Sequence, residues 1–216
     1  MKSTEKLCTM PDLSLEADCH ARGFKMVAGV DEAGRGPLAG PVSAAAVVLP
    51  PGFSCADLDD SKKLSAAKRE RIFESLMATP GLHWSLAYAE PAEIDRINIL
   101  RATHAAMARA VAGLGIEVDH CLIDGLAVPN FAYSHKGVVK GDGLSLSIAA
   151  ASIIAKVARD RRMLDYAEEF PDYGFERHKG YGTKGHLEAL RRHGPCGIHR
   201  FSFQPVAQCS LPIDRS

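Results

Sequence analysis

The chain of 216 residues lacks the features that mark membrane-spanning and secreted proteins. No apolar run approaches the roughly 18–20 residues that cross a bilayer, and the polar residues 1–6 do not form the apolar core of a secretory signal. Aromatic residues are scarce at 6%, yet hydrophobic residues reach 46% and charged residues 24%. These proportions are typical of an ordinary globular protein, so we expect neither a collagen-like chain nor disorder throughout.

The six cysteines form no C-x-x-C pair and no spacing typical of a disulfide framework. A reducing, cytoplasmic location therefore fits the sequence best. An alternative interpretation is that Cys196 and His199, with His193 nearby, form part of a zinc site. No second pair of ligands in the sequence completes such a site.

The chain has no excess of either charge, with 26 Lys and Arg against 26 Asp and Glu. The distribution is uneven, because residues 177–200 contain six Lys or Arg and only one acidic residue, Glu188. A local basic stretch suits a phosphate-bearing partner. A solvated surface segment would have the same composition.

Hydrophobic periodicity predicts strands that alternate with helices. The expected strands are 24–30, 42–49, 84–88, 120–124 and 138–140, and the expected helices are 66–78, 98–113, 145–170 and 184–192. The pattern predicts an α/β fold with a mixed sheet flanked by helices. Residues 24–205 are expected to form one domain with a small helical C-terminal extension at 170–205, between a loosely ordered tail at 1–23 and a second tail at 206–216.

Acidic residues follow three of the predicted strands at the point where each strand ends. Asp31 and Glu32 follow the first, Asp124 ends a central strand, and Asp142 follows the last. Side chains at strand ends line the crevice where α/β proteins bind ligands. Converging carboxylates repel one another unless hard cations such as Mg²⁺ or Mn²⁺ neutralise them. The four acids therefore predict a metal centre, although each alone would also fit a turn or a helix cap.

Asp31 and Glu32 are adjacent, and neighbours in a regular strand point to opposite faces of the sheet. We expect the strand to break between them, as the following Ala33-Gly34 allows, so that both side chains serve one site.

The segment Gly34-Arg-Gly-Pro-Leu-Ala39 matches the G-x-G-x-x-A dinucleotide fingerprint. That interpretation needs a helix to begin here, but Pro41 would lie inside it and the chain from Val42 has strand character. We favour a turn in which Gly34 and Gly36 let the backbone approach a polar ligand and expose N–H donors.

Basic and aromatic residues could extend this site toward a nucleic acid. Lys62 and Lys63 precede a predicted helix, where phosphate contact would explain a charge that the helix dipole disfavours. Lys140 and Lys184 could continue the basic rim, and Tyr181, between two glycines, could stack on a sugar or base. Solvent-exposed lysines and a tyrosine folded onto the core are the structural alternatives.

The segments that carry these residues resemble the signature blocks of the type 2 ribonucleases H, the ribonuclease HII family. The blocks occur in the family's order and cover roughly residues 24–204. They are Gly29–Val42, Asp60-Ser-Lys-Lys-Leu-Ser65, Leu122-Ile-Asp-Gly125, Lys140-Gly-Asp142, Ser147–Asp160, Gly180-Tyr-Gly-Thr183 and His199-Arg200. Gly197 and Phe201 stand where many relatives have proline and a basic residue, which affects only local contacts.

The resemblance implies a ribonuclease H-like fold and a two-metal endonuclease. Such an enzyme cuts RNA in RNA–DNA hybrids, nicks duplex DNA on the 5′ side of single ribonucleotides, leaves 5′-phosphate and 3′-hydroxyl ends, and serves replication and repair. Asp31, Glu32, Asp124 and Asp142 match the four acids that hold two Mg²⁺ or Mn²⁺ ions.

The resemblance also implies how substrate is selected. Gly34-Arg35-Gly36 and Tyr181 match the elements that read the junction between a ribonucleotide and the next deoxynucleotide, whereas Asp160 is expected to pair with a neighbouring arginine. Lys62, Lys63, Lys140 and Lys184 would bind flanking phosphates.

Two other classes share parts of this pattern. A related two-metal DNA nuclease would have the acids without a 2′-hydroxyl reader, and a non-catalytic hybrid-binding module would bind without cutting. Gln208-Cys-Ser-Leu211 loosely resembles the tags that bind sliding clamps but lacks their aromatic pair. We expect a monomer with no membrane partner.

Overall fold

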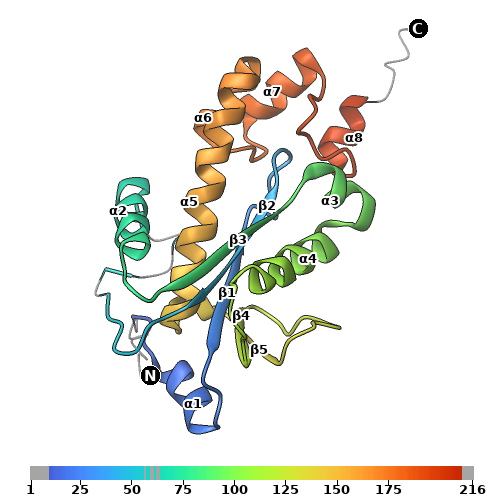
Figure 1. The fold of residues 1–216 in the computed structure, drawn as a ribbon. Helices are drawn as coiled ribbons and strands as arrows, with labels where there is room; N and C mark the ends of the chain where they lie inside the picture. Colours follow the sequence, from blue (N-terminus) through green and yellow to red (C-terminus); the bar gives the residue numbers. More distant parts are fainter. Residues whose placement is uncertain (1–9, 56, 59–60, 62–63, 211–216) are drawn as a thin grey trace, which may run out of the picture.

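The computed structural model describes residues 10–55, 57–58, 61 and 64–210. Its centre is a five-stranded sheet in the order β3-β2-β1-β4-β5 (Figure 1). The strands are β1 Val27–Ala33, β2 Val42–Val48, β3 His83–Ala89, β4 His120–Asp124 and β5 His135–Val138. β2 runs antiparallel to β1 and β3, whereas β4 is parallel to both β1 and β5. This mixed α/β sheet confirms the predicted fold class.

Helices cover both faces of the sheet (Figure 1). The α-helices are α1 Ser14–Ala21, α2 Ala66–Met77, α3 Pro91–Ile97, α4 Ile99–Ala112, α5 Leu146–Glu169, α6 Phe175–His178, α7 Lys184–His193 and α8 Gln204–Ser210, with short 3₁₀ turns η1 Gly141–Gly143 and η2 Pro171–Tyr173. Alternate residues of β2 serve the two layers: Ala44 packs in the core with α4, and Ala45 packs in the core with α2 and α5. None of the helices in the described ranges is long and apolar enough to cross a membrane.

Helix α5 lies unusually close to β1 because small residues separate the two backbones. A Cβ atom built on Gly29 would stand only 2.1 Å from the backbone carbon of Ser147. The first half of α5 contributes three consecutive fully buried alanines, Ala149 to Ala151. This close approach carries the middle of α5 along the sheet toward the end of β1, where the acidic residues lie.

Part of the expected N-terminal tail is structured. Residues 14–21 form α1, and Glu16 is buried against the first turn of α5. Its Oε1 accepts hydrogen bonds from the Ser145 hydroxyl at 2.6 Å and from the Ser147 backbone N–H at 2.9 Å. These partners are far away in sequence, so local patterning could not predict the contact.

The C-terminal boundary also differs from the expectation. Helix α8 continues to Ser210, past the predicted domain end at residue 205, and Val206 is fully buried beside Leu38 and Leu190. An antiparallel bridge joins Ala39 to His199. The C-terminal elements therefore gather around the connection between β1 and β2, at the opposite end of the molecule from α1 (Figure 1).

Candidate active site

Three of the four predicted acids border one cavity. Asp31 and Glu32 lie at the carboxyl end of β1, and Asp124 is the last residue of β4. Because β1 and β4 are parallel neighbours, these ends meet at the same edge of the sheet. All three residues line a cavity of about 240 Å³.

The expected break between Asp31 and Glu32 does not occur. β1 remains a paired strand through Ala33, opposite β2. Val30 and Ile123 are buried in the core that contains α4, so alternation directs Asp31 and Asp124 to the α5 face and Glu32 to the α4 face. Glu32 nevertheless lines the cavity, and it lies beyond Val30, the last residue of β1 that pairs with β4.

Asp31 is the electrostatically strained member of the group. Its side chain is only 3% exposed. Burial raises the pKa of Asp31 well above its ordinary value, and the neighbouring carboxylates of Glu32 and Asp124 raise it further. Hydrogen bonds from Ser152 and from the Glu32 backbone N–H at 2.7 Å favour the ionised form but do not outweigh these effects.

The other two carboxylates have protein partners. Glu32 Oε1 accepts from the Arg35 guanidinium at 3.3 Å, and Asp124 Oδ1 accepts from the Gly141 backbone N–H at 2.7 Å. Among the described residues, no group of three or more Asp, Glu, His or Cys side chains is arranged so that it could hold a metal ion. The donor set nevertheless fits a hard divalent cation, since the pocket offers carboxylate oxygens and its buried Asp31 is repelled by two others.

Asp142 lies beside this group without lining the cavity. It sits in η1 and is 4% exposed. The preceding residue, Gly141, donates its N–H to Asp124. The structure therefore connects Asp142 to the acid group through the backbone next to it.

The glycine-rich turn and Tyr181 face the same cavity as the acids. A Cβ atom on Gly36 would stand 3.7 Å from Cε1 of the Tyr181 ring, so these two elements are in close contact. The turn leads directly into β2 with no intervening helix. The dinucleotide-binding interpretation is therefore wrong, because a pyrophosphate would have no helix N-terminus here.

A histidine pair supports the backbone of Tyr181. His186 Nδ1 lies 2.9 Å from the Tyr181 carbonyl oxygen, which can only accept, so this nitrogen is the donor. His186 Nε2 then accepts from His199 Nε2 at 3.0 Å. Cys196 and His199, considered as zinc ligands, are instead within hydrogen-bond distance of each other, with Cys196 Sγ 3.1 Å from Nδ1.

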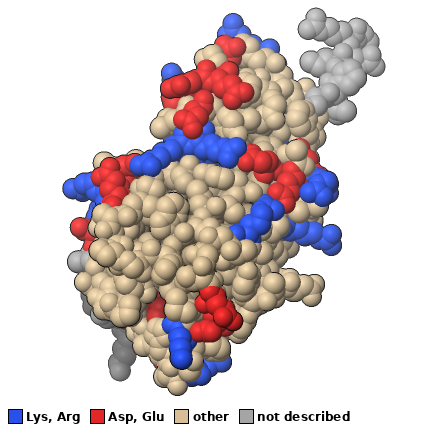
Figure 2. Space-filling view, in the orientation of Figure 1, with Lys and Arg blue, Asp and Glu red and all other residues tan. Residues whose placement is uncertain are grey.

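The expected basic rim is less continuous than the sequence suggested. Lys140 and Lys184 are exposed and do not line the acidic cavity. Lys184 is paired loosely with Glu188 at 3.9 Å. Lys62 and Lys63 lie outside the described residues. On the face drawn in Figure 2, basic and acidic side chains are mixed and a broad central area carries neither.

Helix α5 supplies cavity residues that were not predicted as site residues. Ser152 and Lys156 line the cavity, and Asp160 follows on the same helix face. Lys156 Nζ lies 2.6 Å from Asp160, which also contacts Arg69 at 3.9 Å. The expectation that Asp160 pairs with an arginine is confirmed. The i, i+4 spacing of these polar residues along one helix was the signal available in the sequence.

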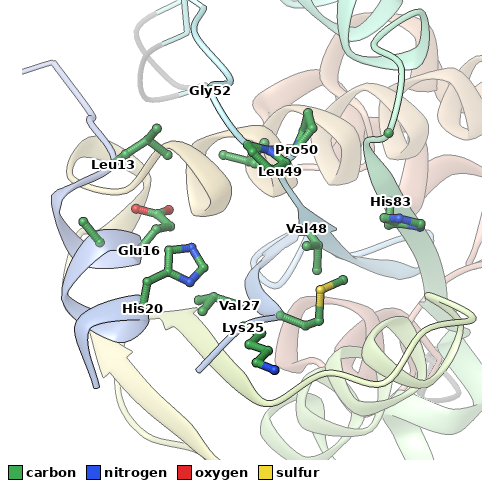
Figure 3. Close-up of a pocket in the computed structure, with 14 residues that line it drawn as sticks. Leu13, Glu16, His20, Lys25, Val27, Val48, Leu49, Pro50, Gly52 and His83 are labelled. Carbon is green, nitrogen blue, oxygen red and sulfur yellow. The ribbon is translucent and has the colours of Figure 1, made fainter. Parts of the chain in front are cut away.

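A larger cavity, of about 510 Å³, lies at the other end of β1 and β2 (Figure 3). Glu16 and His20 project into view from α1, and Leu49 and Pro50 stand across from them. Glu16 is the only carboxylate among its described lining residues, and its walls are mainly apolar. The cavity of about 240 Å³ is therefore the candidate active site, since Asp31, Glu32 and Asp124 all line it.

Comparison with known proteins agrees with this geometry. The family model described as ribonuclease HII matches residues 28–206. A ribonuclease HII from Rhodospirillum rubrum is 57% identical, covering 94% of this chain and 95% of the relative. The enzyme of the same name from Geotalea daltonii is 51% identical over 91% of this chain and 90% of the relative.

Solved structures share the fold. The ribonuclease H2 of Pyrococcus horikoshii OT3 superposes with a TM-score of 0.72 at 24% identity, covering 86% of this chain and 97% of that one. Ribonuclease HII of Archaeoglobus fulgidus, solved in complex with PCNA, gives 0.68 at 25% identity over 83% and 96%. Bst-RNase HIII in complex with Mn²⁺ gives 0.68 at 18% identity over 88% and 71%. The chain therefore belongs to the ribonuclease HII family and is a ribonuclease H enzyme.

Proposed function

We propose that the chain cuts the RNA strand of RNA–DNA hybrids and nicks duplex DNA on the 5′ side of a single ribonucleotide. The observation that carries this proposal is the convergence of Asp31, Glu32 and Asp124 with the glycine-rich turn and Tyr181 in one cavity. The acids would bind the metal ions for phosphodiester cleavage, and the turn and Tyr181 would recognise the sugar of the substrate. The Mn²⁺ complex of the Bst neighbour supports a dependence on divalent metal.

The acids would hold two Mg²⁺ or Mn²⁺ ions, with Asp142 joining Asp31, Glu32 and Asp124. When bound, such ions activate a water molecule and stabilise the charge that develops on the leaving 3′ oxygen. Lys156 adds a cation to the cavity wall, where it attracts the oxygens of the substrate phosphate. The products are 5′-phosphate and 3′-hydroxyl ends, and no serine or cysteine nucleophile is needed.

Selectivity for RNA would depend on the 2′-hydroxyl, the group that separates RNA from DNA. Gly36 leaves space for a substrate sugar to approach the backbone of the turn, whereas the missing side chain of Gly34 makes room for the buried Arg159 side chain. Tyr181 is 44% exposed, so its ring can stack on the following sugar. A DNA nuclease with the same acids would have no use for this second set of residues.

One labelled duplex with a single ribonucleotide tests the proposal. We expect a divalent-metal-dependent nick on the 5′ side of the ribonucleotide and little cutting of the all-DNA control. Equal cutting of both duplexes would favour the DNA nuclease alternative. Binding of a hybrid without any cutting would favour the non-catalytic module.

Replacing Tyr181 with Ala should lower the nicking rate by about tenfold to a hundredfold, because a stacking contact is worth roughly 1–3 kcal/mol. Tyr181→Phe keeps the ring and should retain most of the activity. Steady-state rates on the single-ribonucleotide duplex measure both variants. An unchanged rate for Tyr181→Ala would remove the stacking role.

Metal binding should stabilise the folded protein through Asp31. Because the folded-state pKa of Asp31 is raised above 3.8, ionising it opposes folding, and stability is lost as pH rises through the folded pKa. At neutral pH without divalent ions, Asp31→Asn should therefore melt at a higher temperature than the wild type. Mg²⁺ or Mn²⁺ should raise the melting temperature of the wild type more than that of the variant. Equal shifts in both proteins would place the metal elsewhere.

We also propose a role in removing ribonucleotides from DNA during replication and repair, and a contact with a sliding clamp. The PCNA complex of the Archaeoglobus fulgidus relative supports the clamp contact. In this chain, Gln208 and Cys209 belong to α8, and Leu211 lies outside the described residues. Co-elution with a clamp, lost on removal of residues 208–216, would support it.

A further inference from the structure

Arg200 is a buried cation with an unusual set of partners. Its side chain is fully buried, and among the described residues no carboxylate forms an ion pair with it. Its guanidinium donates instead to three backbone carbonyls, those of Gly34 at 2.6 Å, Arg35 at 2.9 Å and Gly40 at 2.9 Å. Burying a cation without a carboxylate partner is costly. The three hydrogen bonds to carbonyls offset that cost and, at the same time, fix the backbone of the turn.

The three hydrogen bonds set the direction of the peptide groups in the turn. In a trans peptide the C=O and the following N–H point in opposite directions, and the described chain contains no cis peptide. With the carbonyls of Gly34 and Arg35 turned inward to Arg200, the N–H groups of Arg35 and Gly36 point away from it. Both residues line the acidic cavity. Neither N–H donates to any other described residue, so both remain available to a ligand.

A second buried arginine fixes the surroundings of the turn. Arg159 donates to the carbonyls of Ala39, Pro41 and Lys179 at 3.1, 2.9 and 3.0 Å. Through the bond to Lys179, Arg159 connects the loop that precedes Tyr181 to the segment between β1 and β2. Arg159 thus holds the two loops together, whereas among the described residues only Arg200 bonds the carbonyls of Gly34 and Arg35.

We propose that Arg200 is a specificity-determining positioning residue, which turns two carbonyls of the glycine-rich turn inward and thereby presents the Arg35 and Gly36 N–H groups to the 2′-hydroxyl of the substrate. The inference rests on the proposed function, because it assigns the means by which that site recognises a ribonucleotide. Arg200 does not touch the substrate and acts only through the backbone of the turn. The fork of a guanidinium is needed, since a lysine ammonium keeps the charge but lacks the geometry to bind several carbonyls.

The test compares affinities for a single-ribonucleotide duplex and for the all-DNA duplex of the same sequence. Turnover is prevented by working in an Asp124→Asn background. Adding Arg200→Lys should lower the preference for the ribonucleotide duplex by about tenfold to a hundredfold, with little change in affinity for DNA. Arg109→Lys is the matched control, because Arg109 also donates to a carbonyl, that of Tyr88, but lies outside the site. Its preference should stay at the parent value.

If Arg200→Lys weakens the binding of both duplexes equally, the ratio of the two affinities stays unchanged. That result would indicate a general loss of structure and would overturn the inference. If Arg200→Lys does not fold, amide NMR of the ¹⁵N-labelled Asp124→Asn protein gives the answer. The Arg35 and Gly36 amide signals should move when the ribonucleotide duplex binds and move less with all-DNA. Identical shifts with both duplexes would reject the role. Failure of the wild type to nick the ribonucleotide duplex would instead reject the proposed function itself.

Discussion

Asp124→Asn is expected to lower the nicking rate on a single-ribonucleotide duplex by about a thousandfold or more, the scale of losing a transition-state-stabilising group. The substitution removes one of the three carboxylates that border the cavity. It should leave the fold intact, because an asparagine oxygen can still accept the 2.7 Å hydrogen bond from the Gly141 N–H. Removing a negative charge near Asp31 also relieves repulsion. We therefore expect an unchanged or higher melting temperature together with the lost rate.

Asp119→Asn is a matched control for this result. Asp119 directly precedes β4, whereas Asp124 is its last residue. The Asp119 carboxylate accepts hydrogen bonds from the backbone N–H groups of Lys25 and Met26 at 2.8 Å each. The same chemical change there should leave the rate per folded molecule unaltered. If Asp124→Asn nicks at the wild-type rate, Asp124 is not part of the catalytic group. A comparable loss in Asp119→Asn would show that the effect is not local to the cavity.

Gly29→Ala is expected to have the largest effect on stability. The added methyl group would stand 2.1 Å from the Ser147 carbon and 2.4 Å from the Ile148 nitrogen, both backbone atoms of α5. Backbone atoms cannot rotate away, so the helix must move off the sheet. Overpacking of this kind costs about 3 kcal/mol or more, which corresponds to a drop of roughly 6–12 °C in melting temperature for a chain of this size. The nicking rate should fall as well, since α5 carries Ser152 and Lys156 into the cavity.

Gly185→Ala provides the comparison. Gly185 lies in α7, and a Cβ atom built there meets nothing within 4 Å. The same substitution should be neutral or stabilise the protein by about 0.5–1 kcal/mol, because alanine restricts the unfolded chain. Thermal melting of both variants measures the difference. A Gly29→Ala protein as stable as Gly185→Ala would mean that α5 does not pack on β1 at this distance.

The sequence was sufficient for four of the five strands and for the position of the candidate site, whereas the strand expected at 138–140 lies instead at His135–Val138. Each of the acids Asp31, Glu32 and Asp124 lies at the end of an apolar run, and in α/β sheets the side chains at such strand ends line the ligand-binding crevice. The position of the glycine-rich turn follows from the same reasoning, since it directly continues β1. The ends of the strands can be located from the local sequence pattern alone, because hydrophobic periodicity does not depend on which distant residues a strand contacts.

Tertiary structure alone decided how that site is supported. Arg159 and Arg200 read in the sequence as ordinary basic residues, yet both are fully buried and hold the turn through backbone carbonyls more than 100 positions away in the chain. Glu16 is likewise an unremarkable residue of an expected tail until Ser145 and Ser147 are placed beside it. The reason is physical: an apolar pattern records which face of an element is buried, whereas a hydrogen bond to a carbonyl depends on where the folded chain brings that carbonyl, and every residue has one.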